Sequence, residues 1–160
     1  EGQPACKGPA LSLGYWNDED ANRELRTDDG WFLMGDLVEV NSEGWLKVTG
    51  RVSDIIIRGG KNISAVAIER EVELHPKVAL VAVVPKPDLK LGEIAAAYVQ
   101  LHAGEHLTLE ELRHFLRAQG VSIEWWPETL NVLESLPISS GGKVAKGELK
   151  DLIKSKEKSQ

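Results

Sequence analysis

The spacing of hydrophobic and polar residues changes along the chain, and its first third shows short, separate patterns. Residues 17–29 are strongly polar, and they leave room only for a short helix capped by Asn17 or Asp18. Apolar and polar residues alternate over 36–40 and again over 45–48, with a Ser-Glu-Gly turn between them. The alternation and the turn together predict a β-hairpin.

From residue 54 onward the apolar positions predict a compact α+β domain. In chain order we expect a strand at 55–57, a helix from Ser64 to about His75, strands at 78–84 and 94–101, a helix after Thr108, a strand at 129–133 and a last helix around 149–153. The nearly all-apolar run at 78–84 predicts a buried central strand. Thr108 and Glu111 form a capping box, and Gly120 ends that helix.

A polar stretch at 51–54 separates these two regions. We expect residues 1–52 to be the trailing end of a larger domain, because they form hairpins without a core of their own. Residues 53–154 then form the small α+β domain, and residues 155–160 form a frayed tail. The chain does not start with Met and its first nine residues read as a loop, which predicts a fragment of a longer protein.

Composition narrows the class of protein. Of the 160 residues 42% are hydrophobic and 28% charged, which is typical of a globular chain, and the net charge of −6 argues against a nucleic-acid partner. A single cysteine excludes an internal disulfide, and neither a signal peptide nor a transmembrane segment is visible, which fits the cytoplasm. We expect no metal site, and a surface or capping role for each of the four histidines, His75, His102, His106 and His114.

Three polar positions are candidates for chemistry. Lys143 stands on a loop with two adjacent glycines, where a mobile positive charge suits a phosphate or a developing oxyanion. Asp36 follows a glycine at a strand start and could accept hydrogen bonds from a ribose diol. Arg51 ends the hairpin, where its planar group suits phosphate or ribose oxygens. Taken singly, each residue also has a structural interpretation: a capped turn, a surface ion pair or a solvated lysine.

In this order and spacing, the motifs resemble the adenylate-forming superfamily of acyl-CoA synthetases, peptide-synthetase adenylation domains and luciferases. The similar stretches are residues 8–16, 30–37, 50–69 and 137–143, so the resemblance covers nearly the whole chain. It implies a small C-terminal lid domain with an antiparallel sheet flanked by helices, preceded by a β-hairpin remnant of a large N-terminal domain. The large domain would supply the ATP-phosphate loop, which this sequence lacks.

The resemblance also implies roles for single residues. Asp36 and Arg51 would bind the adenosine ribose, and Lys143 would reach the α-phosphate and the attacking carboxylate. The lid would then rotate about a hinge, for which both Ser53 and Asp54 are candidates.

The second step would use the glycine pair of the lid. Gly59 and Gly60 would lie beside the tunnel for the pantetheine arm of CoA, because a bare backbone lets a narrow thiol pass. Family members often carry a lysine just before the proline that corresponds to Pro127, where this chain has Trp125 and Trp126. These two indoles could belong to the core, to an interface with the large domain or to a stacking surface, and we expect the core or the interface.

The resulting prediction is the C-terminal part of an ATP-dependent acyl-CoA synthetase that acts on a carboxylic acid, with a fatty acid as first choice. It would form acyl-AMP and then transfer the acyl group to CoA, with Mg²⁺ on the triphosphate. The choice of a CoA ligase rests on residues 55–62. The alternatives are the lid of a peptide-synthetase adenylation domain and a non-catalytic module that binds a nucleotide or a partner. The isolated chain is predicted to be inactive.

Overall fold

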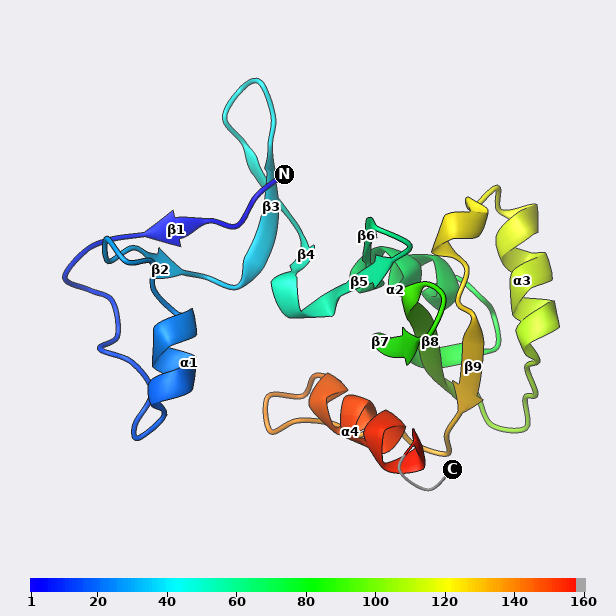
Figure 1. Cartoon of the computed structure of the whole chain (residues 1–160). Helices are drawn as coiled ribbons and strands as arrows, with labels where there is room; N and C mark the ends of the chain where they lie inside the picture. The colour runs from blue at the N-terminus through cyan, green and yellow to red at the C-terminus, as the bar shows by residue number, and fades with distance from the viewer. Residues whose placement is uncertain (158–160) are drawn as a thin grey trace. The chain divides into compact units, whose positions relative to one another are not determined.

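The computed structural model describes residues 1–157, which form two compact units (Figure 1). The first unit is Glu1–Ser53, and the second begins at Asp54. The predicted boundary lay one residue earlier, between positions 52 and 53.

The first unit contains one short helix and two pairs of strands. Its elements are β1 (Ala5–Cys6), α1 (Glu19–Glu24), β2 (Phe32–Leu33), β3 (Asp36–Val40) and β4 (Leu46–Arg51). Asp18 caps α1, since its side chain accepts a hydrogen bond from the Ala21 backbone at 3.0 Å. Of the two predicted caps, Asp18 is therefore the one used. The small β1–β2 pair was not predicted, because two-residue strands leave no alternation to detect.

The predicted hairpin is present as β3 and β4, which pair antiparallel. Its second strand is longer than the alternation at 45–48 indicated, and it runs on to Arg51. The register therefore places Asp36 directly opposite Arg51. A short 3₁₀ turn, Val52–Asp54, follows the hairpin.

The second unit is built on one five-stranded sheet. Its strands are β5 (Ile55–Arg58), β6 (Lys61–Ser64), β7 (Val78–Asp88), β8 (Gly92–Leu101) and β9 (Thr129–Val132). The strand order is β6-β5-β8-β7, and β9 pairs with β8. All pairs are antiparallel except β8–β9, which is parallel. The predicted α+β class with an antiparallel sheet is confirmed, with β9 as the exception.

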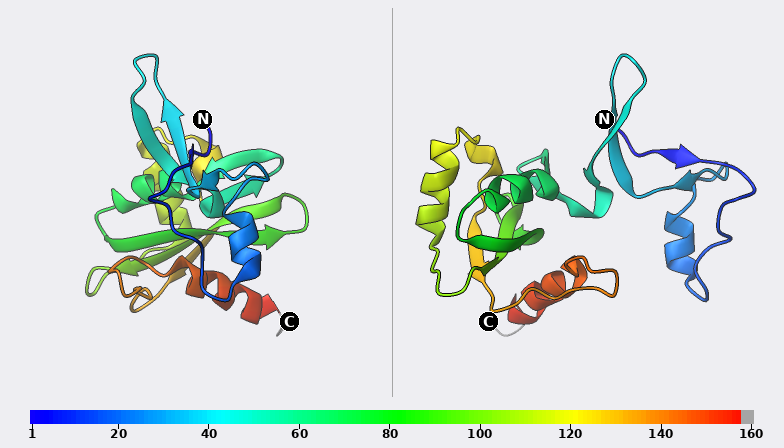
Figure 2. Two further views of the ribbon diagram at one scale, coloured as in Figure 1. Left: turned by 90° about the vertical axis from the view of Figure 1, so that its left-hand side faces the viewer. Right: turned by 180° about the vertical axis from the view of Figure 1, so that it is seen from behind.

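Helices cover both faces of this sheet. They are α2 (Ala65–Glu73), α3 (Leu109–Ala118), the 3₁₀ turn η2 (Ile123–Trp125) and α4 (Lys146–Glu157). The side chains of α2 and α3 share one core with alternate residues of β7 and β8. The other residues of those strands form a second core with Leu149 and Ile153 of α4, which Figure 2 shows on the opposite side of the strands. The predicted capping box of Thr108 and Glu111 is confirmed.

The strand expected at the centre of the sheet lies at its edge. β7 ends the strand order, and it continues to Asp88 through Pro85 and Pro87. The prediction was wrong because β7 is covered by helices on both faces and so reads as a central strand. Prolines fit here because the outward N–H groups of an edge strand have no neighbouring strand to bond.

Three further expectations need correction. Residues 61–64 form β6, a strand that was not predicted because its hairpin is too short to show alternation. His75 is buried, where a surface or capping role was expected. The helix α4 runs to Glu157, so the predicted tail at 155–160 is helical up to that residue, and positions 158–160 lie outside the described residues.

Candidate functional site

Asp36 and Arg51 form one polar pair at the base of the β3–β4 hairpin. The Arg51 Nε–H donates to Asp36 Oδ1 at 3.0 Å. The backbone of Val52 also donates to the Gly35 carbonyl at 2.9 Å, which closes this end of the hairpin. Both side chains keep solvent contact, so a diol could accept from the guanidinium and donate to the carboxylate at the same point. The structure thus brings the two predicted ribose residues together.

Lys143 stands on a closed turn rather than a loose loop. Ile138 and Val144 form an antiparallel bridge across its base. The Lys143 carbonyl accepts from the backbone N–H of Ser139 at 2.7 Å and from its hydroxyl at 2.9 Å. Gly142 has φ +77°, a conformation that glycine adopts without strain. The turn therefore holds the backbone of Lys143 while its side chain is exposed.

A largely buried charge cluster lies where this turn enters α4, and it was not predicted from the sequence. Lys146 Nζ contacts Asp54 Oδ2 at 3.0 Å and Glu69 Oε1 at 2.9 Å. Burial raises the pKa of the Glu69 carboxyl above its usual value, while the Lys146 ammonium and the Val83 backbone N–H oppose this shift. The only sequence signal was a lysine three residues after Lys143, which is not distinctive.

The two hinge candidates differ in their surroundings. Asp54 begins the second unit and is tied by its carboxylate to Lys146 and, at 3.7 Å, to Lys150. Ser53 ends the first unit and is exposed. Asp54 is therefore fixed within the second unit, which makes Ser53 the better candidate for the rotating position.

Gly59 and Gly60 form the tip of the β5–β6 hairpin. Their φ angles are +57° and +80°, as in a two-residue type I′ turn, for which glycine is favoured. A Cβ on Gly60 would meet no atom within 4 Å. The Gly59 backbone donates to the Leu91 carbonyl at 2.7 Å. The turn thus presents an open backbone surface, as a passage for a narrow ligand requires.

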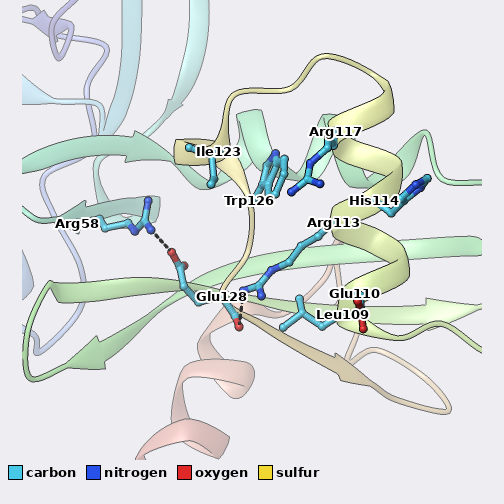
Figure 3. A pocket seen from close by; sticks show the side chains of 9 residues that line it. All are labelled: Arg58, Leu109, Glu110, Arg113, His114, Arg117, Ile123, Trp126 and Glu128. Atoms are coloured by element: carbon cyan, nitrogen blue, oxygen red, sulfur yellow. Dashed lines mark hydrogen bonds and ion pairs between the residues drawn. The ribbon is translucent and has the colours of Figure 1, made fainter.

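A hollow of about 670 Å³ lies beside α3 (Figure 3). Its lining residues are Arg58, Leu109, Glu110, Arg113, His114, Arg117, Ile123, Trp126 and Glu128. Figure 3 shows Arg58 paired with Glu128, at 2.7 Å, and Arg113 near the backbone that precedes β9. Arg117 stacks on the Trp126 ring with its guanidinium carbon 5.3 Å from the ring centroid. The arginines are thus largely engaged by protein groups.

The two tryptophans before Pro127 differ. Trp126 packs against the main core, and its Nε1–H donates to the Val121 carbonyl at 3.0 Å. The expectation of a core role is confirmed for Trp126. Trp125 is 40% exposed, so its expected part in an interface stays a prediction.

The described residues contain neither a cluster of metal ligands nor a membrane-spanning helix. Within residues 1–157, no group of three or more His, Cys, Asp or Glu side chains could hold a metal ion. None of the helices described here is long and apolar enough to cross a bilayer.

The predicted site residues are divided between the two units. Asp36 and Arg51 lie together in the first unit, whereas Lys143, Gly59 and Gly60 lie at two separate turns of the second.

Comparison with known proteins identifies the second unit. Residues 67–143 match the model of the AMP-binding enzyme C-terminal domain. The crystal structure of ATP-bound MatB from Rhodopseudomonas palustris matches with a TM-score of 0.81 and 30% identity, over 94% of this chain and 30% of that one. Fold and match together define the class as a C-terminal domain of AMP-binding enzymes.

Curated relatives extend the match to the first unit. The medium-chain fatty-acid–CoA ligase of Escherichia coli (strain K12) is 39% identical over 147 residues, which are 91% of this chain and 26% of that protein. The salicylyl-CoA synthase / salicylate adenylyltransferase of Streptomyces sp is 39% identical over 150 residues, 94% of this chain and 27% of that protein. The chain belongs to the adenylate-forming enzymes, and it spans about a quarter of the length of these relatives.

Proposed function

We propose that this chain is the C-terminal part of an ATP-dependent acyl-CoA ligase. The enzyme would activate a carboxylic acid, with a fatty acid as first choice, and transfer it to CoA. The observation that carries the proposal is the exposed Lys143 side chain on a fixed turn, in a chain that aligns along nine tenths of its length with two enzymes named for acyl-CoA formation. A cytoplasmic location stays a prediction.

The chemistry assigns one role to each part of the site. In the first step a carboxylate oxygen attacks the α-phosphorus of ATP, and the bond to pyrophosphate breaks. Lys143 would stabilise the negative charge that gathers on the phosphoryl oxygens. Asp36 and Arg51 would hold the ribose so that the α-phosphate meets the attacking oxygen in line.

In the second step the thiol of CoA attacks the acyl carbon and AMP leaves. The lid would rotate about Ser53 between the two steps, because Lys143 and the Gly59-Gly60 turn lie at different places on the second unit. The glycine turn would then line the path of the thiol arm. Mg²⁺ would neutralise the triphosphate before the first step.

The test uses the longer enzyme that contains this chain. ATP–pyrophosphate exchange reports the first step, and thioester formation from supplied acyl-AMP reports the second. We expect Lys143→Ala to lower exchange by about 10³-fold, on the scale of a lost charge-stabilising group, and to leave the second step nearly unchanged. A panel of fatty and aromatic acids identifies the substrate class.

The matched control is Lys154→Ala, a solvated lysine on α4 whose side chain is 72% exposed. It should leave both steps unchanged. If Lys143→Ala also leaves exchange intact, the proposed role of Lys143 is wrong. Transfer to a carrier protein but not to free CoA would instead favour a peptide-synthetase type of enzyme.

A further inference from the structure

Lys146, Asp54 and Glu69 meet beside the outer edge of β7, and Lys150 Nζ lies 3.7 Å from Asp54 Oδ1; of these residues only Asp54 was predicted, as a hinge candidate. Lys146 Nζ lies 3.0 Å from Asp54 Oδ2 and 2.9 Å from Glu69 Oε1. Glu69 Oε1 also accepts the backbone N–H of Val83 at 2.6 Å. Asp54 begins the second unit, Glu69 lies on α2 and Lys146 begins α4. The cluster therefore joins three segments that are far apart in the sequence.

The cluster is largely buried, unlike the exposed Lys154–Asp151 ion pair further along α4. The exposed fractions of the Lys146, Asp54 and Glu69 side chains are 20%, 14% and 17%. Burying such charges costs desolvation, so a buried pair adds little net stability compared with apolar packing. Leu149 and Ile153 already hold α4 on the sheet. The charges therefore fix where α4 begins and contribute little to the free energy that holds α4 on the sheet.

The position of Lys146 constrains Lys143, because the two residues are close in sequence and hydrogen bonds hold the turn that contains Lys143. Lys146 follows Lys143 by three residues. The Lys143 carbonyl accepts from Ser139, and the Ala145 N–H donates to the Pro137 carbonyl at 2.8 Å. With Lys146 held in the cluster, both arms of the turn are attached to the body of the second unit.

We propose that Asp54, Glu69 and Lys146 are positioning residues that fix the direction in which the Lys143 side chain leaves the second unit. The inference rests on the proposed role of Lys143 in adenylate formation. Asp54 attaches the segment that follows Ser53 to the same ammonium group. The Lys146 ammonium group therefore holds both the segment by which the chain enters the second unit and the base of the Lys143 turn. A catalytic group on a moving domain requires such support.

Lys146→Met tests the proposal in the longer enzyme, because methionine keeps an unbranched stem and removes the ammonium. We expect the rate of ATP–pyrophosphate exchange to fall about 10- to 100-fold, the scale of a misplacement of about 1 Å. The KM for ATP should stay within about twofold, since ribose binding is unaffected. Thioester formation from supplied acyl-AMP should stay within about threefold, because Lys143 is not used in that step.

Two variants serve as controls. Lys154→Met lies on the same helix in the exposed pair with Asp151 and should change neither step. Lys146→Arg keeps the positive charge and should recover much of the exchange rate. The proposal is overturned if Lys146→Met lowers both steps equally, which a merely structural residue would do, or lowers neither.

A third variant keeps the test decisive if Lys146→Met does not fold. Glu69→Gln retains an oxygen for the Val83 N–H and removes the charge that faces Lys146. It should lower exchange selectively, and the absence of a selective loss overturns the proposal. Lys143→Ala is measured in parallel: if it leaves exchange intact, the proposed function fails. If it abolishes exchange while Lys146 and Glu69 variants do not, only the positioning role fails.

Discussion

At the scale of single residues, His75 shows how burial sets a charge state. It lies at the end of α2 with its ring against Phe115, at 4.7 Å between centroids, and its Nδ1 accepts the Lys77 backbone N–H at 3.2 Å. Burial lowers the pKa of His75, and the nearby Lys77 ammonium lowers it further. The ring is therefore neutral in the folded chain at neutral pH.

This lowered pKa predicts a loss of stability in mild acid. Below pH 6.5 the unfolded chain gains a proton on this histidine that the folded chain does not, so the free energy of unfolding falls as the pH drops. We expect His75→Gln to flatten this part of the profile, measured by urea unfolding between pH 5 and 7.

The comparison must be made with the wild type at each pH, because the raised pKa of Glu69 acts in the opposite direction. A group that binds its proton more tightly in the folded chain adds stability as the pH falls. His102→Gln, at an exposed position, is the control and should keep the wild-type slope. A slope unchanged by His75→Gln contradicts the assignment.

Asp36 carries a second prediction at this scale. Its ion pair with Arg51 is partly exposed, and such pairs contribute at most about 1 kcal/mol to stability. In the longer enzyme we expect Asp36→Ala to change the melting temperature little but to raise the KM for ATP about 10-fold or more, as the loss of a charged hydrogen bond to the ribose would. Glu39→Ala, exposed on the same strand, is the control. Equal effects of both variants would speak against a ribose contact.

At the scale of elements, substitutions in the β5–β6 turn can distinguish the effect of backbone strain from that of a side chain that blocks the thiol path. Gly60 has φ +80° and open space around its missing Cβ. We expect Gly60→Ala to cost about 1 kcal/mol of unfolding free energy through conformation alone. Gly60→Asn should cost less, because asparagine tolerates this region, yet its longer side chain should slow thioester formation and spare pyrophosphate exchange. If both steps respond alike, the turn does not border the thiol path.

Elements were predictable where their signal is local. The capping box at Thr108 depends on four neighbouring residues, and the β3–β4 hairpin depends on alternation around one turn. The position of β7 in the sheet depends on what covers its faces, and β6 depends on a two-residue turn, so neither could be read from periodicity. The same limit applies to the Lys146 cluster, whose members are separated by up to 92 residues.

At the scale of the whole molecule, the candidate site is divided in a way that the motifs anticipated. Each predicted residue belongs to a motif that is contiguous in sequence, and the structure gives each motif a defined turn or strand pair. The contacts that join Asp54, Glu69 and Lys146 were not predicted, because these residues meet only after the sheet and its helices have assembled. Candidate site residues can be recognised in the sequence because each lies in a contiguous motif. The contacts that hold these motifs in place join distant residues and are seen only in the folded structure.

This division predicts that the 160-residue chain alone forms no acyl-adenylate. Asp36 and Arg51 are predicted to contact the ribose, and the sequence lacks the phosphate loop of the family. Two solvent-exposed polar contacts provide little net binding free energy once the entropic cost of binding is subtracted. We therefore expect ATP to bind with a Kd of about 1 mM or weaker. Isothermal calorimetry and pyrophosphate exchange on the purified chain test this, with Arg51→Ala as the variant that should abolish any residual heat. Submicromolar binding or measurable turnover would show that the chain carries more of the nucleotide site than these two residues.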